Sequence, residues 1–401
     1  MQVYLVGGAV RDELLGRPIK DKDFVVVGTT VADMLAAGFH QVGADFPVFL
    51  HPTNQQEYAL ARTERKLGHG YQGFSVHASP DVTLQEDLQR RDLTVNAMAI
   101  EVTDLADDTP ITGEVIDYYG GLDDIKSKTL RHVSSAFSED PLRVLRVARF
   151  YGRYYDLGFS IADETLVLMR QLVASGELTH LSAERVWQES SRAMMQTCPQ
   201  VYWEQLFSIG ALAALYPYLS STWQHRTVQD MILSSLRFAG QMQLAIHQRW
   251  ALLMASFLLD LNPTLFNNTY RDEDLVDTAI AAQAASTLGN AAKVPKALTQ
   301  FASLFVQQAA NLVAIEQLTA AQKIDLIQAC SAHKEPDKLS QLLVTSHVLQ
   351  LARQHRQMML ALNSFYAVNM EAIAPELKGP AIGAALRQAR IEHLQTQANQ
   401  S

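Results

Sequence analysis

Cysteine is nearly absent from this 401-residue sequence, in which only Cys198 and Cys330 occur, far apart and outside any CxxC or Cys/His grouping. That scarcity excludes a disulfide scaffold and a zinc site, and we expect both thiols to be reduced. The N-terminus also lacks the basic and apolar regions of a secretory signal. The longest apolar run, from Trp250 to Leu259, is too short to cross a bilayer. We therefore expect a cytoplasmic protein that makes no use of a membrane.

The sequence also lacks an excess of positive charge. Its 42 acidic residues outnumber its 33 Lys and Arg residues, and the formal net charge is −9 at pH 7. Nucleic-acid-binding proteins are usually basic, so this balance argues against such a partner. Net charge averages over all faces, however. Between Lys126 and Arg153 the chain has seven Lys and Arg residues and only two acidic ones, Glu139 and Asp140. A basic stripe of this kind on an acidic body can still follow phosphates.

The pattern of apolar residues changes along the chain. With 401 residues, of which 48% are hydrophobic, two or three domains are expected. Short β-like runs and Gly or Pro punctuation dominate up to about residue 137, and helical spacing takes over beyond Pro141. The prediction is an α+β protein, in which a head of mixed sheet and helices (1–137) precedes an all-helical neck (138–222) and body (223–401).

Individual elements of the head are also predicted. The expected strands are Val3–Val6, Phe24–Val27, Pro47–Leu50, Tyr58–Ala61 and Val115–Asp117. The expected helices are Val10–Leu15, Val31–Ala37 and Leu84–Met98, the second behind a Thr29/Thr30 cap and the third behind Thr83.

Gly7 and Gly8 form the first motif with chemical meaning. They stand between the strand-like Leu5-Val6 and a predicted helix. Glycines at such a turn let the backbone approach a phosphate, and the helix N-terminus offers free N–H groups to it. Arg11, one turn into the helix, can add a guanidinium to the same phosphates. The alternative is an ordinary strand-to-helix turn.

Asp21 and Asp23 form the second motif, at positions i and i+2 at the entry to an apolar strand. Side chains in a strand alternate between faces, so the two carboxylates should point the same way. They would repel one another unless a cation lay between them, and Mg²⁺ suits oxygen ligands beside substrate phosphates. Glu57 is the candidate third carboxylate. The alternatives are a solvated pair of aspartates and a surface glutamate.

Further motifs follow in order, and together they resemble a known family. After GGAVRD and the DxD pair, the sequence contains RRDLTVNA (90–97), EDPLR (139–143), and Arg62–Lys66 followed by Gly68, Gly70 and Gly73. Over about residues 1–220 the chain is similar to the class II tRNA nucleotidyltransferases of the DNA polymerase β superfamily. Residues 1–100, including GADFPVFLHP, resemble the proteobacterial CCA-adding enzymes in particular.

This resemblance implies an activity and roles for residues. The activity is template-independent addition of CCA to the 3′ end of tRNA from CTP and ATP. Arg91 is implied to contact the nucleotide, and Asp92 and Asn96 to lie near its sugar. The motif that begins at Glu139 is implied to select the base, and the 62–73 loop to help switch from C to A addition.

Asp140 and Arg143 suit base selection on physical grounds as well. At positions i and i+3 of a helix begun by Pro141, they should share one face. A carboxylate accepts from an exocyclic amine and a guanidinium donates to a ring acceptor. Cytosine and adenine present that combination, whereas uracil and guanine would leave the carboxylate unpaired, at a cost of about 1–3 kcal/mol. The alternative is a surface ion pair, which contributes only about 0.2–0.5 kcal/mol.

The expected mechanism needs two Mg²⁺ ions at Asp21 and Asp23. They would activate the RNA 3′-hydroxyl for in-line attack on the α-phosphorus and steady the pyrophosphate that leaves. Arg11, Arg91 and Arg146 would add charge near the phosphates or sugar. The basic stretch 126–153 with the neck and body would hold the tRNA acceptor arm by its shape and phosphates. We expect no obligate protein partner.

One departure from the family pattern concerns the body. Some relatives carry a C-terminal HD domain with a His-Asp metal doublet, but this sequence has no His-Asp dipeptide. The stretch Ala255–Leu261 looks like the corresponding helix, with Leu259 at the place of the histidine. Leucine cannot bind a metal. We therefore expect a degenerate HD-like region without phosphohydrolase activity, in which Asp260 is a capping or surface residue.

Three alternatives remain open from the sequence. A bacterial poly(A) polymerase shares the first motifs, although a more basic tail would be expected of it. An enzyme that adds only the terminal A is a second. A catalytically inactive RNA-binding relative is the third, and the intact pair of aspartates argues against it.

Overall fold

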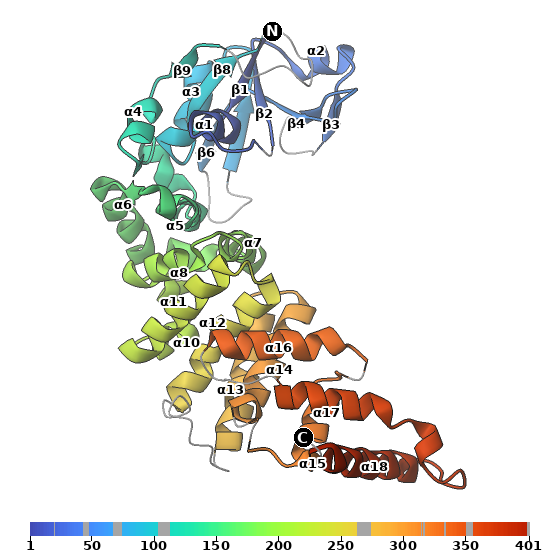
Figure 1. The fold of residues 1–401 in the computed structure, drawn as a ribbon. Helices are drawn as coiled ribbons and strands as arrows, with labels where there is room; N and C mark the ends of the chain where they lie inside the picture. The colour runs from blue at the N-terminus through green and yellow to red at the C-terminus, as the bar shows by residue number, and fades with distance from the viewer. Residues whose placement is uncertain are drawn as a thin grey trace. The chain divides into compact units, whose positions relative to one another are not determined.

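The computed structural model describes residues 1–19, 21–42, 48–66, 74–102, 113–262, 274–313, 315, 317–332, 334–349 and 356–398 (Figure 1). The chain divides into two compact units, Met1–Ala193 with Val201–Leu215, and Met194–Gln200 with Tyr216–Ser401. The first unit contains a seven-stranded mixed sheet with helices, and the described part of the second is built of helices. The predicted fold class, an α+β head followed by a helical region, is confirmed.

The sheet centres on two strands that begin and end at the functional motifs. Its order is β3-β4-β5-β2-β1-β8-β9. β1 (Gln2–Val6) pairs antiparallel with β2 (Asp23–Val27) and β8 (Met98–Glu101), and β2 pairs in parallel with β5 (Glu57–Leu60). The remaining strands are β3 (His40–Val42), β4 (Val48–Leu50) and β9 (Val115–Asp117). Because β1 and β2 are antiparallel, the C-terminal end of β1 lies beside the N-terminal end of β2. The glycine turn and the aspartate pair therefore lie at the same end of these two central strands.

Both faces of β1 are buried, which explains its unbroken apolar run. Val3 and Leu5 lie in a core cluster with Val10 of α1 (Gly8–Leu14) and Met34 of α2 (Val31–Ala36). Tyr4 and Val6 lie in a second cluster that includes Leu88 of α3 (Leu84–Gln89). Covered strands of this kind are apolar at every position.

The predicted helix Leu84–Met98 is wrong beyond its first six residues. Helix α3 covers Leu84–Gln89 and starts at the expected Thr83, which makes a capping box with Glu86. Leu93 then adopts an extended conformation and bridges to His132, and residues Met98–Glu101 form β8. The Asp92 side chain accepts from the Leu93 N–H at 2.9 Å, which competes with helix formation. Pairing with β1 thus overrides the local helical pattern.

Four strands of three or more residues were not predicted from the sequence. β8 begins at Met98, the last residue of the expected helix, and β3 is short and exposed. β6 (Arg62–Lys66) and β7 (Phe74–Ala78) form a separate antiparallel pair, and β6 is too polar to show an apolar alternation. Residues 67–73 of the expected C-to-A loop, residues 43–47 of GADFPVFLHP and Lys20 lie outside the described residues.

The helices of the first unit follow the predicted order. Their bounds are α1 Gly8–Leu14, α2 Val31–Ala36, α3 Leu84–Gln89, α4 Gly121–Lys126, α5 Leu142–Tyr154, α6 Asp163–Ala174, α7 Ala183–Met194, α8 Pro199–Ser208 and α9 Ala211–Leu215. Two-residue strands β10 (Thr129–Leu130) and β11 (Ser160–Ile161), which were not predicted, pair in parallel, so a short sheet joins the end of the predicted head to the predicted helical neck. α5 and α7 carry the charged residues of the site.

The second unit packs around one apolar helix, α12 (Ile246–Leu261), which contacts α11, α13, α14 and α16. The other helices are α10 Pro217–Thr222, α11 Arg226–Gln241, α13 Asp274–Ala291, α14 Lys296–Val313, α15 Ala320–Ala329, α16 Pro336–Val348, α17 Arg356–Ala367 and α18 Pro380–Ala398. Within the described residues, no helix is both long enough and apolar enough to span a membrane.

Candidate active site

Gly7 is required at the turn between β1 and α1 for two reasons. Its φ is +70°, a conformation that side-chain-bearing residues rarely adopt. A Cβ atom placed there would also lie 2.7 Å from the Nη1 atom of Arg91. The backbone at the start of α1 is therefore closely approached by a guanidinium group.

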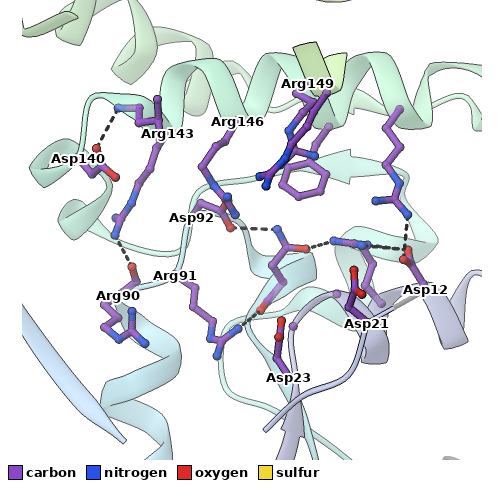
Figure 2. A pocket seen from close by; sticks show the side chains of 18 of the residues that line it. Asp12, Asp21, Asp23, Arg90, Arg91, Asp92, Asp140, Arg143, Arg146 and Arg149 are labelled. Atoms are coloured by element: carbon purple, nitrogen blue, oxygen red, sulfur yellow. Dashed lines mark hydrogen bonds and ion pairs between the residues drawn. The ribbon is translucent and has the colours of Figure 1, made fainter. Parts of the chain in front are cut away.

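A cavity of about 620 Å³ opens in front of this turn (Figure 2). Nine arginines and five aspartates line it, with no lysine among the described residues that do so. All lie in the first unit, on segments as distant in sequence as α1 and α7. The lining residues are Gly7, Gly8, Arg11, Asp12, Asp21, Asp23, Arg90, Arg91, Asp92, Asn96, Asp140, Leu142, Arg143, Arg146, Arg149, Phe150, Arg153, Arg185 and Arg192. Every predicted site residue except Glu57 and Glu139 is among them.

Asp21 and Asp23 both border the cavity, at the start of β2. Asp23 is the first residue of the strand and pairs in register with Val6. The pKa of Asp23 is raised by its removal from water and by the like charge of Asp21, while Arg91 acts in the opposite direction. A cation between the two carboxylates would relieve that repulsion.

Glu57 and Glu139 lie apart from the lining residues. Glu57 stands level with Asp23 on the neighbouring strand β5 but does not line the cavity. Among the described residues, no group of three or more His, Cys, Asp or Glu side chains is arranged to hold a metal ion. Glu139 ends the short 3-10 helix η3 (Ser135–Glu139), next to Asp140. The roles of both glutamates remain predictions.

Asp87, in the last turn of α3, orders the arginines of the RRD motif. It is fully buried and accepts from Arg90 Nη2 at 2.9 Å and from Arg91 Nη2 at 3.4 Å. Burial alone would raise the pKa of Asp87, but the two guanidinium groups hold it below its ordinary value. Arg91 also donates to the carbonyl of Asn96, and its buried Nε has no partner among the described residues. This nitrogen is therefore a spare donor near the cavity.

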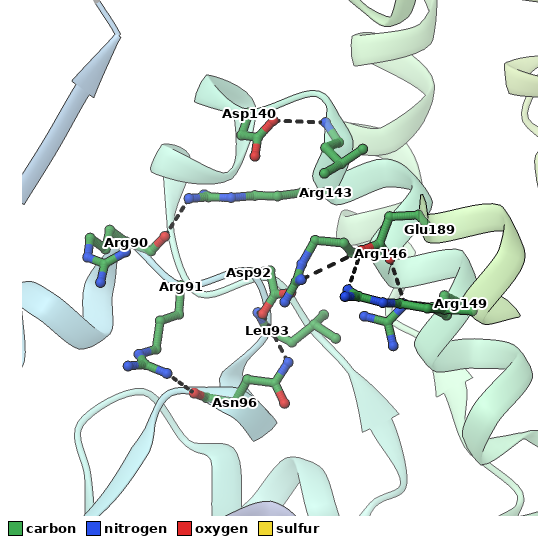
Figure 3. Close-up of polar contacts among 12 residues, drawn as sticks. Arg90, Arg91, Asp92, Leu93, Asn96, Asp140, Arg143, Arg146, Arg149 and Glu189 are labelled. Atoms are coloured by element: carbon green, nitrogen blue, oxygen red, sulfur yellow. Dashed lines mark hydrogen bonds and ion pairs between the residues drawn. The ribbon is translucent and has the colours of Figure 1, made fainter. Parts of the chain in front are cut away.

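Asp92 binds two of the other predicted residues, Asn96 and Arg146 (Figure 3). Its carboxylate accepts from Asn96 Nδ2 at 2.9 Å and from Arg146 Nε at 2.7 Å. Burial alone would raise the pKa of Asp92, but Arg146 and these hydrogen bonds outweigh burial and hold the pKa well below its ordinary range. Asp92 is therefore a fixed anion, which orients Asn96 and Arg146 along the cavity.

Asp140 and Arg143 do not share a helix face, so that prediction is wrong. Asp140 is extended (φ −117°, ψ 104°) and precedes Pro141, the N-cap of α5. The residue before a proline avoids the helical conformation, which explains why Asp140 is extended and lies outside α5. Asp140 instead accepts from the backbone N–H of Leu142 at 3.0 Å and contacts Arg185 Nη2 at 3.2 and 3.3 Å.

Arg143 is directed by backbone groups. It donates to the carbonyl of Ala136 at 2.6 Å and to that of Arg90 (Figure 3). It thereby ties α5 to the RRD segment. Because Arg143 and Asp140 both border the cavity, one ligand there could meet both, although they belong to different backbone segments.

The basic stretch 126–153 is divided by the fold. Lys126 pairs with Asp123 at the surface, and Arg131 pairs with the buried Asp124. The four arginines of α5 instead line the cavity; they are Arg143, Arg146, Arg149 and Arg153. Their spacing of three or four residues places them on one face of the helix.

Helix α7 supplies a buried carboxylate to this arginine face. Glu189 is 3% exposed and accepts from Arg149 Nε at 2.6 Å. It also lies 3.9 Å from Arg146 and 3.6 Å from Arg192 (Figure 3). The sequence analysis did not predict the buried carboxylates Glu189, Asp87 and Asp12 as site residues. The one signal in the sequence is the spacing of the arginines in α5, which predicts a charged helix face that buried carboxylates could pair with.

Two protein-family models match the chain. The first, described as Poly A polymerase head domain, matches residues 3–131. The second, described as probable RNA and SrmB- binding site of polymerase A, matches residues 158–222. Residues of the cavity fall within both matches and in the segment between them.

Individual proteins resemble nearly the whole chain. It is 42% identical to a multifunctional CCA protein of Alcanivorax borkumensis, over 99% of this chain and 98% of that protein. It is 43% identical to a CCA-adding enzyme of Pseudomonas putida, over 98% and 99% respectively. Among solved structures, a CCA-adding enzyme in complex with ATP aligns with a TM-score of 0.64 at 21% identity, over 98% of this chain and 86% of that one. A Thermotoga maritima CCA-adding enzyme complexed with tRNA aligns with a TM-score of 0.63 at 21% identity, over 98% and 87%. At this identity the two structures indicate a shared fold.

Proposed function

The chain belongs to the family of CCA-adding enzymes, and from that membership we propose that it extends the 3′ end of tRNA by C, C and A, using CTP and ATP. The observation that supports this most directly is the cavity of the first unit. It combines a glycine turn at a helix N-terminus, a pair of aspartates and an arginine face in one place. Such a site suits a nucleoside triphosphate and an attacking hydroxyl.

The triphosphate is proposed to lie along the start of α1. Gly7 and Gly8 allow the backbone to approach it, and Arg11, Arg91 and Arg146 supply positive charge. The partnerless Nε of Arg91 supports this placement, because a buried donor without an acceptor is costly. Asp92 and Asn96 are proposed to face the sugar.

Base selection is proposed to rest on Asp140 and Arg143. Arg185 and the Leu142 N–H hold the Asp140 carboxylate in place as an acceptor. Such an acceptor suits the exocyclic amine of cytosine or adenine and disfavours the carbonyl of uracil or guanine. Because the selecting groups belong to the protein, no template strand is needed.

Mg²⁺ is the proposed cofactor, held by Asp21 and Asp23. The fit is chemical, since both ligands are carboxylates and the pKa of Asp23 is raised in part by the like charge of Asp21. Bound Mg²⁺ would lower the pKa of the RNA 3′-hydroxyl and stabilise charge on the leaving pyrophosphate. The arginines of the cavity then hold the phosphates in line and balance the negative charge that develops in transfer.

The second unit is proposed to lack phosphohydrolase activity and to serve tRNA binding. Leu259 is fully buried, and Asp260 pairs with His225 at 3.5 Å. These contacts support a packing role for the helix that resembles the HD doublet region. Because relatives carry the name multifunctional CCA protein, this proposal needs a direct test.

The nucleotidyltransferase function is tested with purified protein, Mg²⁺ and a tRNA transcript that lacks CCA. CTP alone should add two nucleotides, and CTP with ATP should add three. A long run of A would instead indicate a poly(A) polymerase, and extension only of tRNA that already ends in CC would indicate an A-adding enzyme. The absence of extension under every condition would refute the proposed nucleotidyltransferase activity.

Phosphohydrolase activity is tested on the same preparation with 2′,3′-cyclic phosphates and a phosphomonoester, in the presence of Mg²⁺, Ni²⁺ or Mn²⁺. We expect no hydrolysis above that of a heat-inactivated sample. Turnover that Asp260→Asn abolishes, while CCA addition persists, would overturn the proposed scaffold role.

A further inference from the structure

Asp12 is a buried carboxylate for which the proposed reaction provides no role. It follows Arg11 on α1 and is 5% exposed. Its Oδ1 accepts from Arg11 Nε at 3.0 Å, from Arg11 Nη2 at 3.0 Å and from the Tyr154 hydroxyl at 3.1 Å. Its Oδ2 accepts from Arg153 Nη2 at 2.9 Å. One anion therefore collects donors from α1 and from the end of α5.

These contacts fix the orientation of Arg11. With Nε and Nη2 directed to Asp12, the remaining nitrogen Nη1 donates to Asn96 Oδ1. The guanidinium also lies 5.1 Å from the ring centre of Phe150 and 5.3 Å from that of Tyr154. The nitrogen atoms of the Arg11 guanidinium group are thus held by hydrogen bonds, and its central carbon Cζ lies near two aromatic rings. The Arg11 side chain also borders the cavity.

The same hydrogen bonds continue across the cavity wall. Asn96 accepts from Arg11. It also donates to Asp92, which in turn accepts from Arg146 (Figure 3). The result is a chain of alternating donors and acceptors from α1 to α5. Asp12 is the end of this chain, anchored by Arg153 and by Tyr154, which is fully buried.

We propose that Asp12 is a positioning residue for nucleotide binding: it fixes Arg11 in the orientation that meets the triphosphate before the nucleotide arrives. The inference rests on the proposed function of the cavity. A free arginine side chain loses rotamer entropy when it is fixed. Because Asp12 fixes the Arg11 side chain in the folded protein, this entropy is lost on folding and not on nucleotide binding. The nucleotide therefore binds more tightly.

The test is a double-mutant cycle on the equilibrium binding of ATP with Mg²⁺ by the full-length protein. Asp12→Asn and Arg11→Ala should each weaken binding by about tenfold. The double variant should bind no more than twofold more weakly than Arg11→Ala alone, because Asp12 acts through Arg11. Losses that multiply in the double variant would overturn the proposal.

A matched control separates positioning from stability. Asp124 is also a buried carboxylate of the first unit that pairs with an arginine, Arg131, but it does not line the cavity. Asp124→Asn should lower the unfolding temperature without weakening ATP binding. If Asp124→Asn weakens ATP binding as much as Asp12→Asn, the effect is general destabilisation and the proposal fails.

Steady-state kinetics and a charge-retaining variant complete the design. Asp12→Asn should raise KM for ATP and CTP by about tenfold and leave KM for tRNA within about twofold. Asp12→Glu, which keeps the charge, should recover part of the loss. Asp12→Ser, which removes the charge with a smaller side chain, replaces Asp12→Asn in the cycle if that variant does not fold. If the wild-type protein binds ATP through Arg11 but does not extend tRNA, the proposed function fails and the positioning role stands.

Discussion

At position 7 there is no room for even one methyl group. Gly7→Ala would combine a positive φ with a Cβ atom 2.7 Å from Arg91 Nη1. Gly7 lies at φ +70° and ψ −121°, outside the left-handed helical region. We expect the variant to lose about 1–3 kcal/mol of stability from the backbone alone and to raise KM for nucleotides by about tenfold as Arg91 is displaced. Urea unfolding and steady-state kinetics measure the two effects.

Gly16→Ala is the matched control for that prediction. Gly16 also has a positive φ, +62°, but a Cβ there would meet nothing within 4 Å. Its stability should fall by a similar amount while nucleotide KM stays unchanged. An equal rise of KM in both variants would mean that strain, not the contact with Arg91, causes the loss.

Asp21 and Asp23 are expected to serve transfer rather than tRNA binding. Asp21→Ala and Asp23→Asn should each reduce kcat by at least about a thousandfold, because the proposed metal would lose a ligand. The affinity for a tRNA transcript, measured by filter retention, should stay within about threefold of that of the wild-type protein. Appreciable turnover by either variant would exclude the metal role.

Arg143 is expected to contribute to base selection even though it contacts two backbone carbonyls. Arg143→Ala should lower the preference of the enzyme for CTP over UTP and for ATP over GTP by about tenfold, which corresponds to one lost hydrogen bond to the base. Single-nucleotide extension with each triphosphate measures this ratio. Unchanged discrimination would remove Arg143 from base selection and leave it as a tie between α5 and the RRD segment.

Helix α7 contributes one buried carboxylate, Glu189, beside its lining residues Arg185 and Arg192. Glu189→Gln would remove the charge that faces Arg149 and Arg146 while preserving the shape of the side chain. Because Arg146 keeps Asp92 but the buried Arg149 guanidinium loses its anion, we expect a loss of about 3 kcal/mol in the free energy of unfolding. Glu184→Gln, on an exposed position of the same helix, should change it by less than about 0.5 kcal/mol. Equal effects in urea unfolding would contradict the role of Glu189.

The elements show where sequence reasoning succeeds and where it fails. The start of α3 was predictable, because Thr83 and Glu86 form a local capping box. Its end was not, because Leu93 bridges to His132 and residues Met98–Glu101 pair with β1. Such partners are distant in sequence, and no local pattern reveals them.

The same distinction applies to the site. Gly7, Asp21 and Asp23 were predictable, because turn and strand geometry fixes their chemistry locally. Asp12 was not, because its partner Tyr154 lies 142 residues away. The sequence predicts Asp140 as a site residue, and it does line the cavity, but its backbone is extended because Pro141 disfavours the helical conformation in the residue before it.

At the scale of the whole molecule, buried ion pairs make the folded state sensitive to acid. The folded-state pKa values of Asp87 and Asp92 lie below their ordinary values, so both residues contribute stability that is complete above about pH 5. That contribution is lost as the pH falls from about 4 toward the folded-state pKa values. Asp92→Asn should therefore be less stable at pH 7 and lose less stability between about pH 5 and 3 than the wild type.

Urea midpoints measured across this pH range test the prediction, with Asp230→Asn as a control. Asp230 pairs with Arg226 at an exposed position, so its replacement should leave the slope unchanged. Equal slopes for the wild type and Asp92→Asn would show that Asp92 does not contribute to acid sensitivity.

The use of arginine as the basic residue of the described cavity wall has a chemical consequence. Guanidinium groups stay protonated to beyond about pH 12, and they do not form imines with aldehydes as lysine amines do. Pyridoxal phosphate and acylating reagents, which attack amines, should therefore leave this wall intact. Phenylglyoxal, which condenses with guanidinium groups, should modify it, and bound ATP should protect it. The described wall of the cavity should thus resist reagents that acylate lysine but react with dicarbonyl compounds.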